Sequence, residues 1–205
     1  MREQGLLLVL SGPSGVGKGT IASALLKAAP GLNLAISATA RPPRAGEKDG
    51  VNYRFYNEAE FEQMINNGQL LEWAKVYGNY YGTDKKYVAE TLENGGDLLL
   101  EIDIQGALTV KKKMPEAVLV FIAPPSRSAQ RRRLEGRATD AQPEIERRLA
   151  SFDGEIRRAV EYDYIVVNDE VPLAVQKITA VMTAEKQRSH RQIRLLPDYK
   201  NGGLV

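Results

Sequence analysis

A glycine-rich loop between a short apolar run and a helix-forming stretch constrains the fold of this chain more than any other feature. The run Leu6–Leu10 is apolar at consecutive positions, which is typical of a strand buried on both faces of a parallel sheet. The segment SGPSGVGKGT follows at Ser11–Thr20, and Thr20–Ala29 has the pattern of a helix that ends near Pro30. Strand, glycine loop and helix open a βαβ unit, so the sequence predicts a parallel sheet with crossover helices.

The same alternation of apolar runs and helical patterns continues along the chain. Such alternation predicts an α/β fold with a doubly wound parallel sheet. Further strands are expected at Leu98–Ile104, Val118–Ile122 and Tyr164–Val167, and helices at Asn57–Asn66, Lys85–Asn94, Gly106–Lys113, Ala129–Gly136, Pro143–Tyr162 and Leu173–Arg188.

Two segments interrupt the alternation. Residues 36–84 are polar, rich in tyrosine and punctuated by glycine, with a short strand candidate at Tyr53–Tyr56, and predict a small inserted subdomain. Residues 126–158 hold nine arginines and six acids, with a cap candidate at Ser126 and a first-turn proline at Pro143 after a loop. Two basic helices joined by a loop predict a helical lid over an anionic ligand. We expect one domain over residues 1–189 and a loose tail at 190–205.

Composition excludes several classes of protein. The chain has no cysteine and a single histidine, His190, so disulfides, thiolate metal sites and histidine-based catalysis are not expected. A net charge of +2 over 205 residues gives no reason to expect a nucleic-acid or membrane partner. The run Leu6–Leu10 is too short for a signal sequence or a membrane span, which predicts a cytoplasmic protein.

The glycine loop matches a known phosphate-binding pattern. Gly12, Gly17 and Lys18 satisfy G-x-x-x-x-G-K, in which backbone N–H groups and the helix N-terminus surround a phosphate. Lys18 would supply positive charge to the β- and γ-phosphates of a nucleotide. The alternative is a glycine turn with a purely structural role. On the phosphate-site interpretation, the ATP-binding residues are Ser14, Gly15, Val16, Gly17, Lys18, Gly19 and Thr20.

The loop departs from the pattern at one position. The residue after the lysine is ordinarily Ser or Thr, a magnesium ligand, but here it is Gly19, and Thr20 carries the next hydroxyl. We therefore expect Mg²⁺ to be held by nucleotide oxygens and waters, with no assured side-chain ligand. The missing hydroxyl favours a small kinase over a switch GTPase.

A series of motifs in a fixed order then resembles one family. From about Gly5 to Arg188 the chain resembles bacterial guanylate kinase, a P-loop nucleoside-monophosphate kinase. The resemblance implies transfer of phosphate from ATP to GMP, and to dGMP, in purine nucleotide metabolism, with Mg²⁺ as cofactor. Besides the glycine loop, it rests on SATARPPRAGE (37–47), GVNYRF (50–55), LLEWAKVYGNYYGT (70–83), EIDIQGA (101–107), IAPPS (122–126), RRLEGR (132–137) and IVVND (165–169).

Several residues of these motifs have chemistry suited to GMP. Arg41 and Arg44 flank two prolines and form a stiff pair of guanidinium forks for a phosphate; two solvated surface arginines are the alternative. Glu72 follows two leucines, and a buried carboxylate accepts from both the ring N–H and the amino group of guanine; a surface ion pair is the alternative. Acids at the carboxyl end of the strand expected at 98–104 point toward a ligand. The resemblance adds Ser37, Tyr53, Tyr81, Thr83, Glu101 and Asp103 to the GMP set.

The resemblance also assigns roles around ATP. Arg133, Arg137 and Arg148 match the arginines that close on the transferring phosphoryl group, together with Lys18 and Arg44. Asn168 matches a residue near the adenine.

Two other functions remain open from the sequence. A guanylate-kinase-like interaction module would bind partners without catalysis, but such modules lack parts of the phosphate loop. A kinase for AMP or for a sugar phosphate would not need Glu72 and Ser37. The sequence makes no prediction of oligomeric state.

Overall fold

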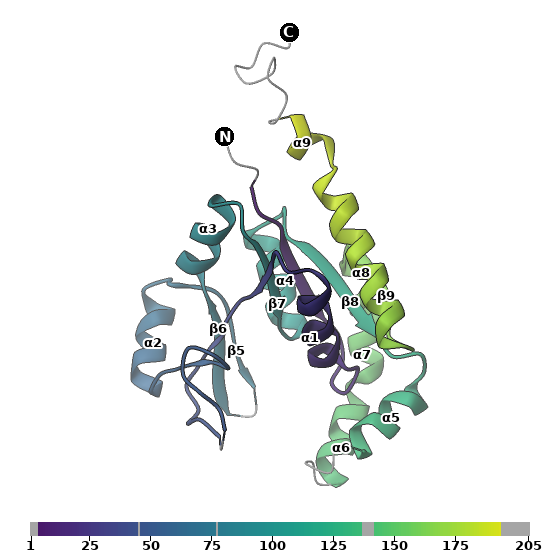
Figure 1. The fold of residues 1–205 in the computed structure, drawn as a ribbon. Coiled ribbons are helices and arrows are strands. Elements are labelled where there is room, and N and C mark those ends of the chain that lie inside the picture. Colours follow the sequence, from purple (N-terminus) through teal and green to yellow (C-terminus); the bar gives the residue numbers. More distant parts are fainter. Residues whose placement is uncertain (1–3, 45, 77, 137–141, 194–205) are drawn as a thin grey trace.

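The computed structural model describes residues 4–44, 46–76, 78–136 and 142–193 (Figure 1). Within these residues a parallel sheet forms the core, in the order β2-β7-β1-β8-β9. After β1 the chain first adds β2 and β7 on one side of this strand and then β8 and β9 on the other. The direction in which strands are added therefore reverses at β1. The doubly wound parallel sheet expected from the sequence is confirmed. The strands are β1 (Leu7–Ser11), β2 (Leu32–Leu34), β7 (Asp97–Glu101), β8 (Val118–Ala123) and β9 (Tyr164–Val167).

Alternate residues of β1 enter two different hydrophobic cores. Leu8 and Leu10 pack with α1 (Lys18–Ala28) and α8 (Val171–Lys186) on one face of the sheet. Leu7 and Val9 pack with α3 (Lys85–Glu93) and α4 (Ile104–Lys113) on the other face. Side chains of a strand point alternately to opposite faces, so a strand covered on both must be apolar throughout.

A second sheet lies beside the core, between β2 and α3 in the chain (Figure 1). Its order is β4-β3-β6-β5, with β3 and β4 parallel and the other pairs antiparallel. Ala38, Phe61 and Leu70 form a small core of its own, with Phe61 contributed by a helix. The elements are β3 (Ala38–Thr39), β4 (Arg54–Phe55), α2 (Glu58–Asn66), β5 (Leu70–Val76) and β6 (Asn79–Asp84).

The arginine-rich segment forms a helical pair at one end of the central sheet (Figure 1). Helices α5 (Arg127–Glu135) and α6 (Gln142–Ala150) pack through Leu134, Ile145 and Leu149, which form a separate apolar cluster. The Ser126 side chain caps α5 by accepting from the backbone N–H of Ala129 at 3.1 Å, as expected.

One long helix was expected over Pro143–Tyr162, and this expectation is wrong. The segment contains α6, then α7 (Phe152–Arg157) and a 3₁₀ turn, η1 (Arg158–Glu161). The break falls at Ser151, whose hydroxyl donates to the carbonyl of Arg148 at 2.9 Å. Such local side-chain bonds compete with regular helix formation.

The strand expected at Leu98–Ile104 is also too long. Strand β7 ends at Glu101, and Asp103 is the N-cap of α4, accepting from the backbone N–H of Gly106 at 2.8 Å. Asp103 therefore starts a helix instead of ending a strand. The edge strand β2 was not foreseen. Helix α9 (Ser189–Gln192) occupies the beginning of the expected tail, and residues 194–205 lie outside the described part of the chain. None of the described helices has the length and apolar character needed to cross a membrane.

A buried carboxylate joins the start of β1 to β7 and α8. Asp97 accepts from the backbone N–H of Leu6 at 2.8 Å and pairs with Lys186 at 2.5 Å. Replacing Asp97 by alanine leaves a buried N–H without its acceptor, so we expect Asp97→Ala to lower the free energy of unfolding by about 2–4 kcal/mol. Asp97→Asn keeps an acceptor and should lose less. Urea denaturation of the three proteins measures the difference; equal losses would contradict the role of the Leu6 bond.

Candidate active site

The glycine loop lies at the carboxyl end of β1, the point at which the strand order of the sheet reverses. In α/β proteins ligands bind at such points. Gly15 and Gly17 have φ angles of 82° and 89°, which side-chain-bearing residues rarely adopt. A Cβ at Gly15 would lie 2.7 Å from the Leu134 side chain, and one at Gly17 would lie 2.8 Å from Asn168 Nδ2. Both positions therefore require glycine for backbone conformation and for space.

Lys18, at the first position of α1, folds back over the loop. Its Nζ donates to the carbonyl oxygens of Gly12 at 2.7 Å and Pro13 at 3.1 Å. The ammonium group thus lies among backbone oxygens at the mouth of the loop, the position at which a nucleotide phosphate would meet it.

Three other segments fasten the loop from outside. Asn168 Nδ2 and Arg133 Nη1 both donate to the carbonyl of Val16, at 2.7 and 3.2 Å. Arg133 Nη2 also donates to the Asn168 carbonyl at 2.8 Å, and Arg148 Nη1 contacts Ser14 Oγ at 3.1 Å. Arg133, Arg148 and Asn168 therefore meet at the loop. Arg137 lies outside the described residues.

A cavity of about 720 Å³ separates the loop from the second sheet. Gly12, Ser14 and Lys18 line one side of it. Six of the nine residues expected to bind GMP also line it. They are Ser37, Tyr53, Glu72, Tyr81, Glu101 and Asp103, whereas Arg41, Arg44 and Thr83 are not among the lining residues.

Glu72 of β5 is the buried acid of this cavity, with 4% of its surface exposed. Its Oε1 accepts from Thr83 Oγ1 of β6 at 2.6 Å. Burial raises the pKa of Glu72 to about 7, and the negative charge of Asp103 adds to the rise, while Thr83 and Lys113 act in the opposite direction. The alternative for Glu72, a surface ion pair, is thus not found among the described residues, and the carboxylate faces a cavity.

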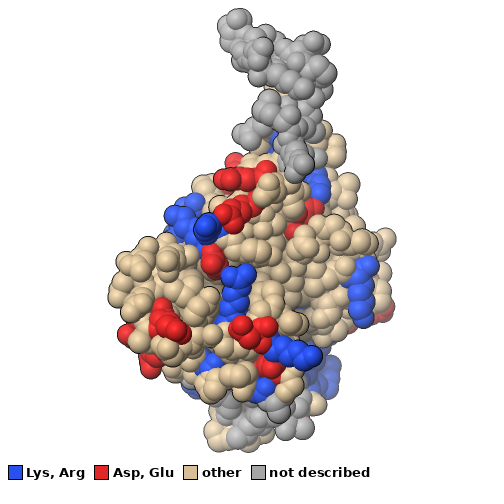
Figure 2. All heavy atoms as spheres, turned by 60° about the vertical axis from the view of Figure 1, so that its left-hand side comes forward, with Lys and Arg blue, Asp and Glu red and all other residues tan. Residues whose placement is uncertain are grey.

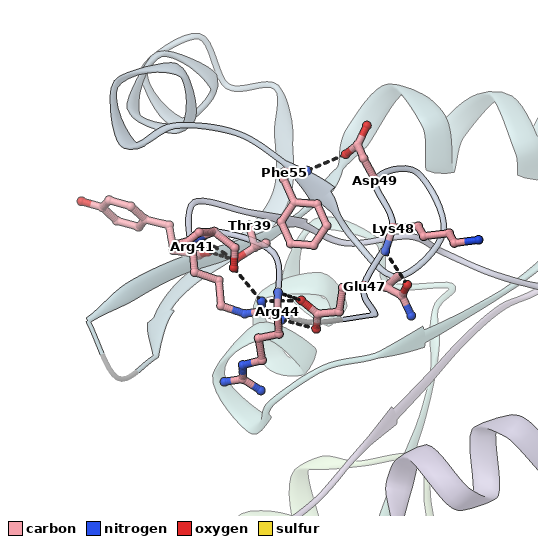
Figure 3. A network of polar contacts seen from close by, with 10 residues as sticks. Thr39, Arg41, Arg44, Glu47, Lys48, Asp49 and Phe55 are labelled. Carbon is pink, nitrogen blue, oxygen red and sulfur yellow. Dashed lines mark hydrogen bonds and ion pairs between the residues drawn. The ribbon is translucent and has the colours of Figure 1, made fainter.

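Arg41 is held in place by a residue to which the sequence analysis assigned no role (Figure 3). Glu47 binds its guanidinium with both oxygens, Nη1 to Oε2 at 2.6 Å and Nη2 to Oε1 at 2.7 Å. The guanidinium carbon lies 5.0 Å from the centre of the Tyr53 ring. Glu47 Oε2 also accepts from the backbone N–H of Arg44 at 2.8 Å, while the Arg44 side chain is exposed. This pairing with Arg41 lowers the pKa of Glu47 to about 2.

Comparison with known proteins identifies this arrangement. Residues 4–185 match the family model for guanylate kinase. The guanylate kinase of Caldanaerobacter subterraneus subsp. tengcongensis is 53% identical, over 93% of this chain and 93% of that protein. The guanylate kinase of Halalkalibacterium halodurans is 50% identical, over 94% of each chain. The crystal structure of guanylate kinase from Anaplasma phagocytophilum is 34% identical, with a TM-score of 0.75, over 93% of this chain and 91% of that chain.

The chain belongs to the guanylate kinase family. The resemblance inferred from the ordered motifs is confirmed.

Membership of the guanylate kinase family implies a divalent metal, and carboxylates near the loop are the side chains that could hold it. Side chains able to hold a metal do not gather in groups of three or more within the described ranges. Glu101 is the acid next to the loop, since a Cβ at Gly19 would lie 3.5 Å from its Oε1. One such carboxylate suits Mg²⁺, which keeps several waters and takes its other ligands from phosphates.

Three residues in and around the site of this guanylate kinase were not identified from the sequence. Glu47 is the last residue of the motif SATARPPRAGE, but a motif does not show which side chain a charged residue pairs with. Gln130 of α5 donates to the Ser14 carbonyl at 2.7 Å, and no pattern marks it. Glu155 of α7 lines the cavity, and burial raises its pKa while the charge of Lys18 opposes the rise. Over the face seen in Figure 2, basic and acidic side chains are interspersed.

The raised pKa of Glu72 predicts how stability depends on pH. The unfolded carboxylate ionises near pH 4.5 and the folded one near pH 7, so the folded state loses stability as pH rises between these values. Glu72→Gln removes the charge and should stabilise the protein by about 1–3 kcal/mol more at pH 8 than at pH 5. Urea midpoints at the two pH values measure this, with the exposed Glu93→Gln as the matched control. An equal gain at both pH values would show that ionisation of Glu72 is not the cause.

Proposed function

We propose that this protein transfers the γ-phosphoryl group of ATP to GMP, giving ADP and GDP, and that it accepts dGMP in the same way. Membership of the guanylate kinase family supports the reaction. The observation that carries it is the single cavity with Lys18 of the phosphate loop on one side and the buried Glu72 on the other. Protein groups able to bind a donor triphosphate and an acceptor base thus face the same cavity. We propose a cytoplasmic enzyme of purine nucleotide metabolism.

Glu72 is the proposed reader of the guanine base. An ionised carboxylate only accepts hydrogen bonds, and guanine presents a ring N–H and an amino group side by side. Adenine presents a bare ring nitrogen at the corresponding position, so AMP would leave the buried carboxylate without donors from the base. Thr83, bonded to Glu72, and Ser37, on the same cavity wall, are the proposed additional contacts to the base.

The GMP phosphate is proposed to meet Arg41, Arg44, Tyr53 and Tyr81. Burial raises the pKa of the Tyr53 phenol, which keeps it protonated and able to donate. The ion pair with Glu47 fixes the direction of the Arg41 fork, and the exposed Arg44 side chain is able to swing onto an arriving phosphate.

The transferring phosphoryl group is proposed to lie among Lys18, Arg44, Arg133, Arg137 and Arg148. The GMP phosphate is itself an anionic nucleophile, so the reaction needs alignment and neutralisation of charge more than a strong base. Bound with ATP, Mg²⁺ would neutralise the β- and γ-phosphates, with Glu101 and Asp103 as the neighbouring acids. The loop residues Ser14–Thr20 are proposed to hold the ATP phosphates, and Asn168 to lie near the adenine.

Closure of two moving parts completes the proposal. Within a kinase domain of residues 1–189, segment 36–84 would carry GMP and segment 126–158 would act as the lid. Their closure would exclude water, which otherwise competes with GMP for the phosphoryl group.

The function is tested by a coupled assay of ADP release with ATP and, in turn, GMP, AMP, CMP and UMP. We expect GMP to be the preferred acceptor, and Lys18→Ala to lower kcat for GMP by at least about 10²-fold while the protein stays folded, since charge stabilisers contribute at this level. A folded Lys18→Ala protein that turns over at the wild-type rate would remove the phosphate loop from catalysis. Activity with none of the four would favour the interaction module.

The role of Glu72 is tested by its alanine variant. Glu72→Ala should raise the KM for GMP and lower kcat/KM by the equivalent of roughly 2–4 kcal/mol, because a charge-assisted contact to two donors is lost. The efficiency with AMP should not fall in parallel, and the KM for ATP should stay near the wild-type value. Measuring kcat/KM for GMP and AMP in both proteins decides it: an unchanged GMP-over-AMP preference would exclude Glu72 as the base reader.

A further inference from the structure

Gly106 in the first turn of α4 lies directly against the Glu72 carboxylate. A Cβ at this position would lie 2.7 Å from Glu72 Oε2 and 3.3 Å from its Cδ. Side-chain carbons do not approach oxygen this closely, so any larger residue would force Glu72 to move. The next nearest atom, Ile102 Cδ1, would be at an ordinary contact distance of 3.4 Å.

The backbone itself does not call for glycine at position 106. Gly106 is inside a helix, and it does not have the positive φ found at Gly15 and Gly17. Within a helix alanine is favoured over glycine, because glycine loses more conformational freedom on folding. The missing side chain therefore lowers the local helix propensity, and the close neighbour that accounts for it is the carboxylate of Glu72.

Helix α4 is capped at its first turn and is joined to strand β5 by a hydrogen bond near its last turn. The Asp103 side chain caps α4 through the Gly106 N–H at 2.8 Å, which fixes where the helix begins. Near the other end, Lys113 Nζ donates to the carbonyl of Leu70, two residues before Glu72, at 3.4 Å. On its other side Glu72 is held by Thr83 at 2.6 Å. The carboxylate is thus enclosed between the β6 hydroxyl and the bare backbone of α4.

We infer that Gly106 is a positioning residue for base selectivity: its lack of a side chain lets the Glu72 carboxylate lie where both oxygens serve the two donors of guanine. The inference rests on the proposed function. A methyl group at position 106 would displace Oε2, which on this inference accepts from the amino group of guanine, so that the carboxylate keeps the ring N–H contact and loses the amino contact. The base selectivity that Glu72 of β5 provides then depends in part on α4, a helix of the central core.

Inosine monophosphate, IMP, whose base is hypoxanthine, is the probe that separates the two contacts. It has the ring N–H and carbonyl of guanine but lacks the amino group. In Gly106→Ala we expect the ratio of kcat/KM for GMP to that for IMP to fall by about tenfold, the size typical of one lost polar contact. The KM for ATP should stay within about twofold of wild type. A ratio is independent of the fraction of active protein, so partial misfolding cannot imitate the result.

Two further proteins complete the experiment. Gly31→Ala is the matched control, because a Cβ there would meet nothing within 4 Å, and its ratio should equal that of wild type. In Glu72→Asp/Gly106→Ala the shorter acid withdraws from the new methyl group, so the two changes should be non-additive, with a ratio above the product of the single effects.

A Gly106→Ala protein with the wild-type ratio, or with equal losses for GMP and IMP, would overturn the inference while leaving the kinase activity established. Wild-type protein that phosphorylates GMP but does not prefer it to IMP would overturn the inference together with the proposed role of Glu72. Wild-type protein inactive toward GMP would instead overturn the proposed function, and these outcomes are distinguishable in one set of assays.

Discussion

The tight packing of the glycine loop against α5 and the end of β9 is the constraint on which the site depends. The loop has no room for side chains at Gly15 and Gly17, and its Val16 carbonyl accepts from both Asn168 and Arg133. These bonds connect the end of β1 to the end of β9 and to α5, three segments far apart in the sequence. A phosphate site made of backbone N–H groups needs such fixation, because an unrestrained loop would lose conformational entropy each time it bound.

Three cations around the site have a property in common: protein oxygens already hold them. Lys18 bonds to the Gly12 and Pro13 carbonyls, Arg133 to the Val16 and Asn168 carbonyls, and Arg41 to the Glu47 carboxylate. A phosphate competes well with carbonyls, since charge-assisted bonds are about twice as strong as those to neutral acceptors. It competes less well with a carboxylate. Lys18 and Arg133 are therefore suited to exchange partners when nucleotide binds, and Arg41 to keep Glu47 as a fixed support.

Much of the fold could be predicted because its signals are local. The apolar run before the loop predicted β1, and the helix-capping preference of serine at Ser126 predicted the start of α5. The failures occurred where a polar side chain overrides an apolar pattern. Asp103 interrupts a segment that alternates like a strand and instead caps α4, and the Ser151 hydroxyl breaks a segment with helical periodicity. Whether such a side chain binds its own backbone or faces solvent depends on the surrounding packing, which the local sequence does not contain.

For the site, residue types could be predicted from chemistry, but their supports could not. A carboxylate after two leucines suggested a buried acceptor at Glu72, and the structure gives its burial and its bond to Thr83. Gly106 comes from an element more than thirty residues later, and only the folded chain shows that its missing side chain faces that carboxylate. An ionised acid at this depth is unfavourable until a ligand supplies donors, which is why its pKa is raised. The bond to Thr83 and the space left at Gly106 hold it against the cavity, so its unfavourable burial is relieved best by a base that supplies two donors.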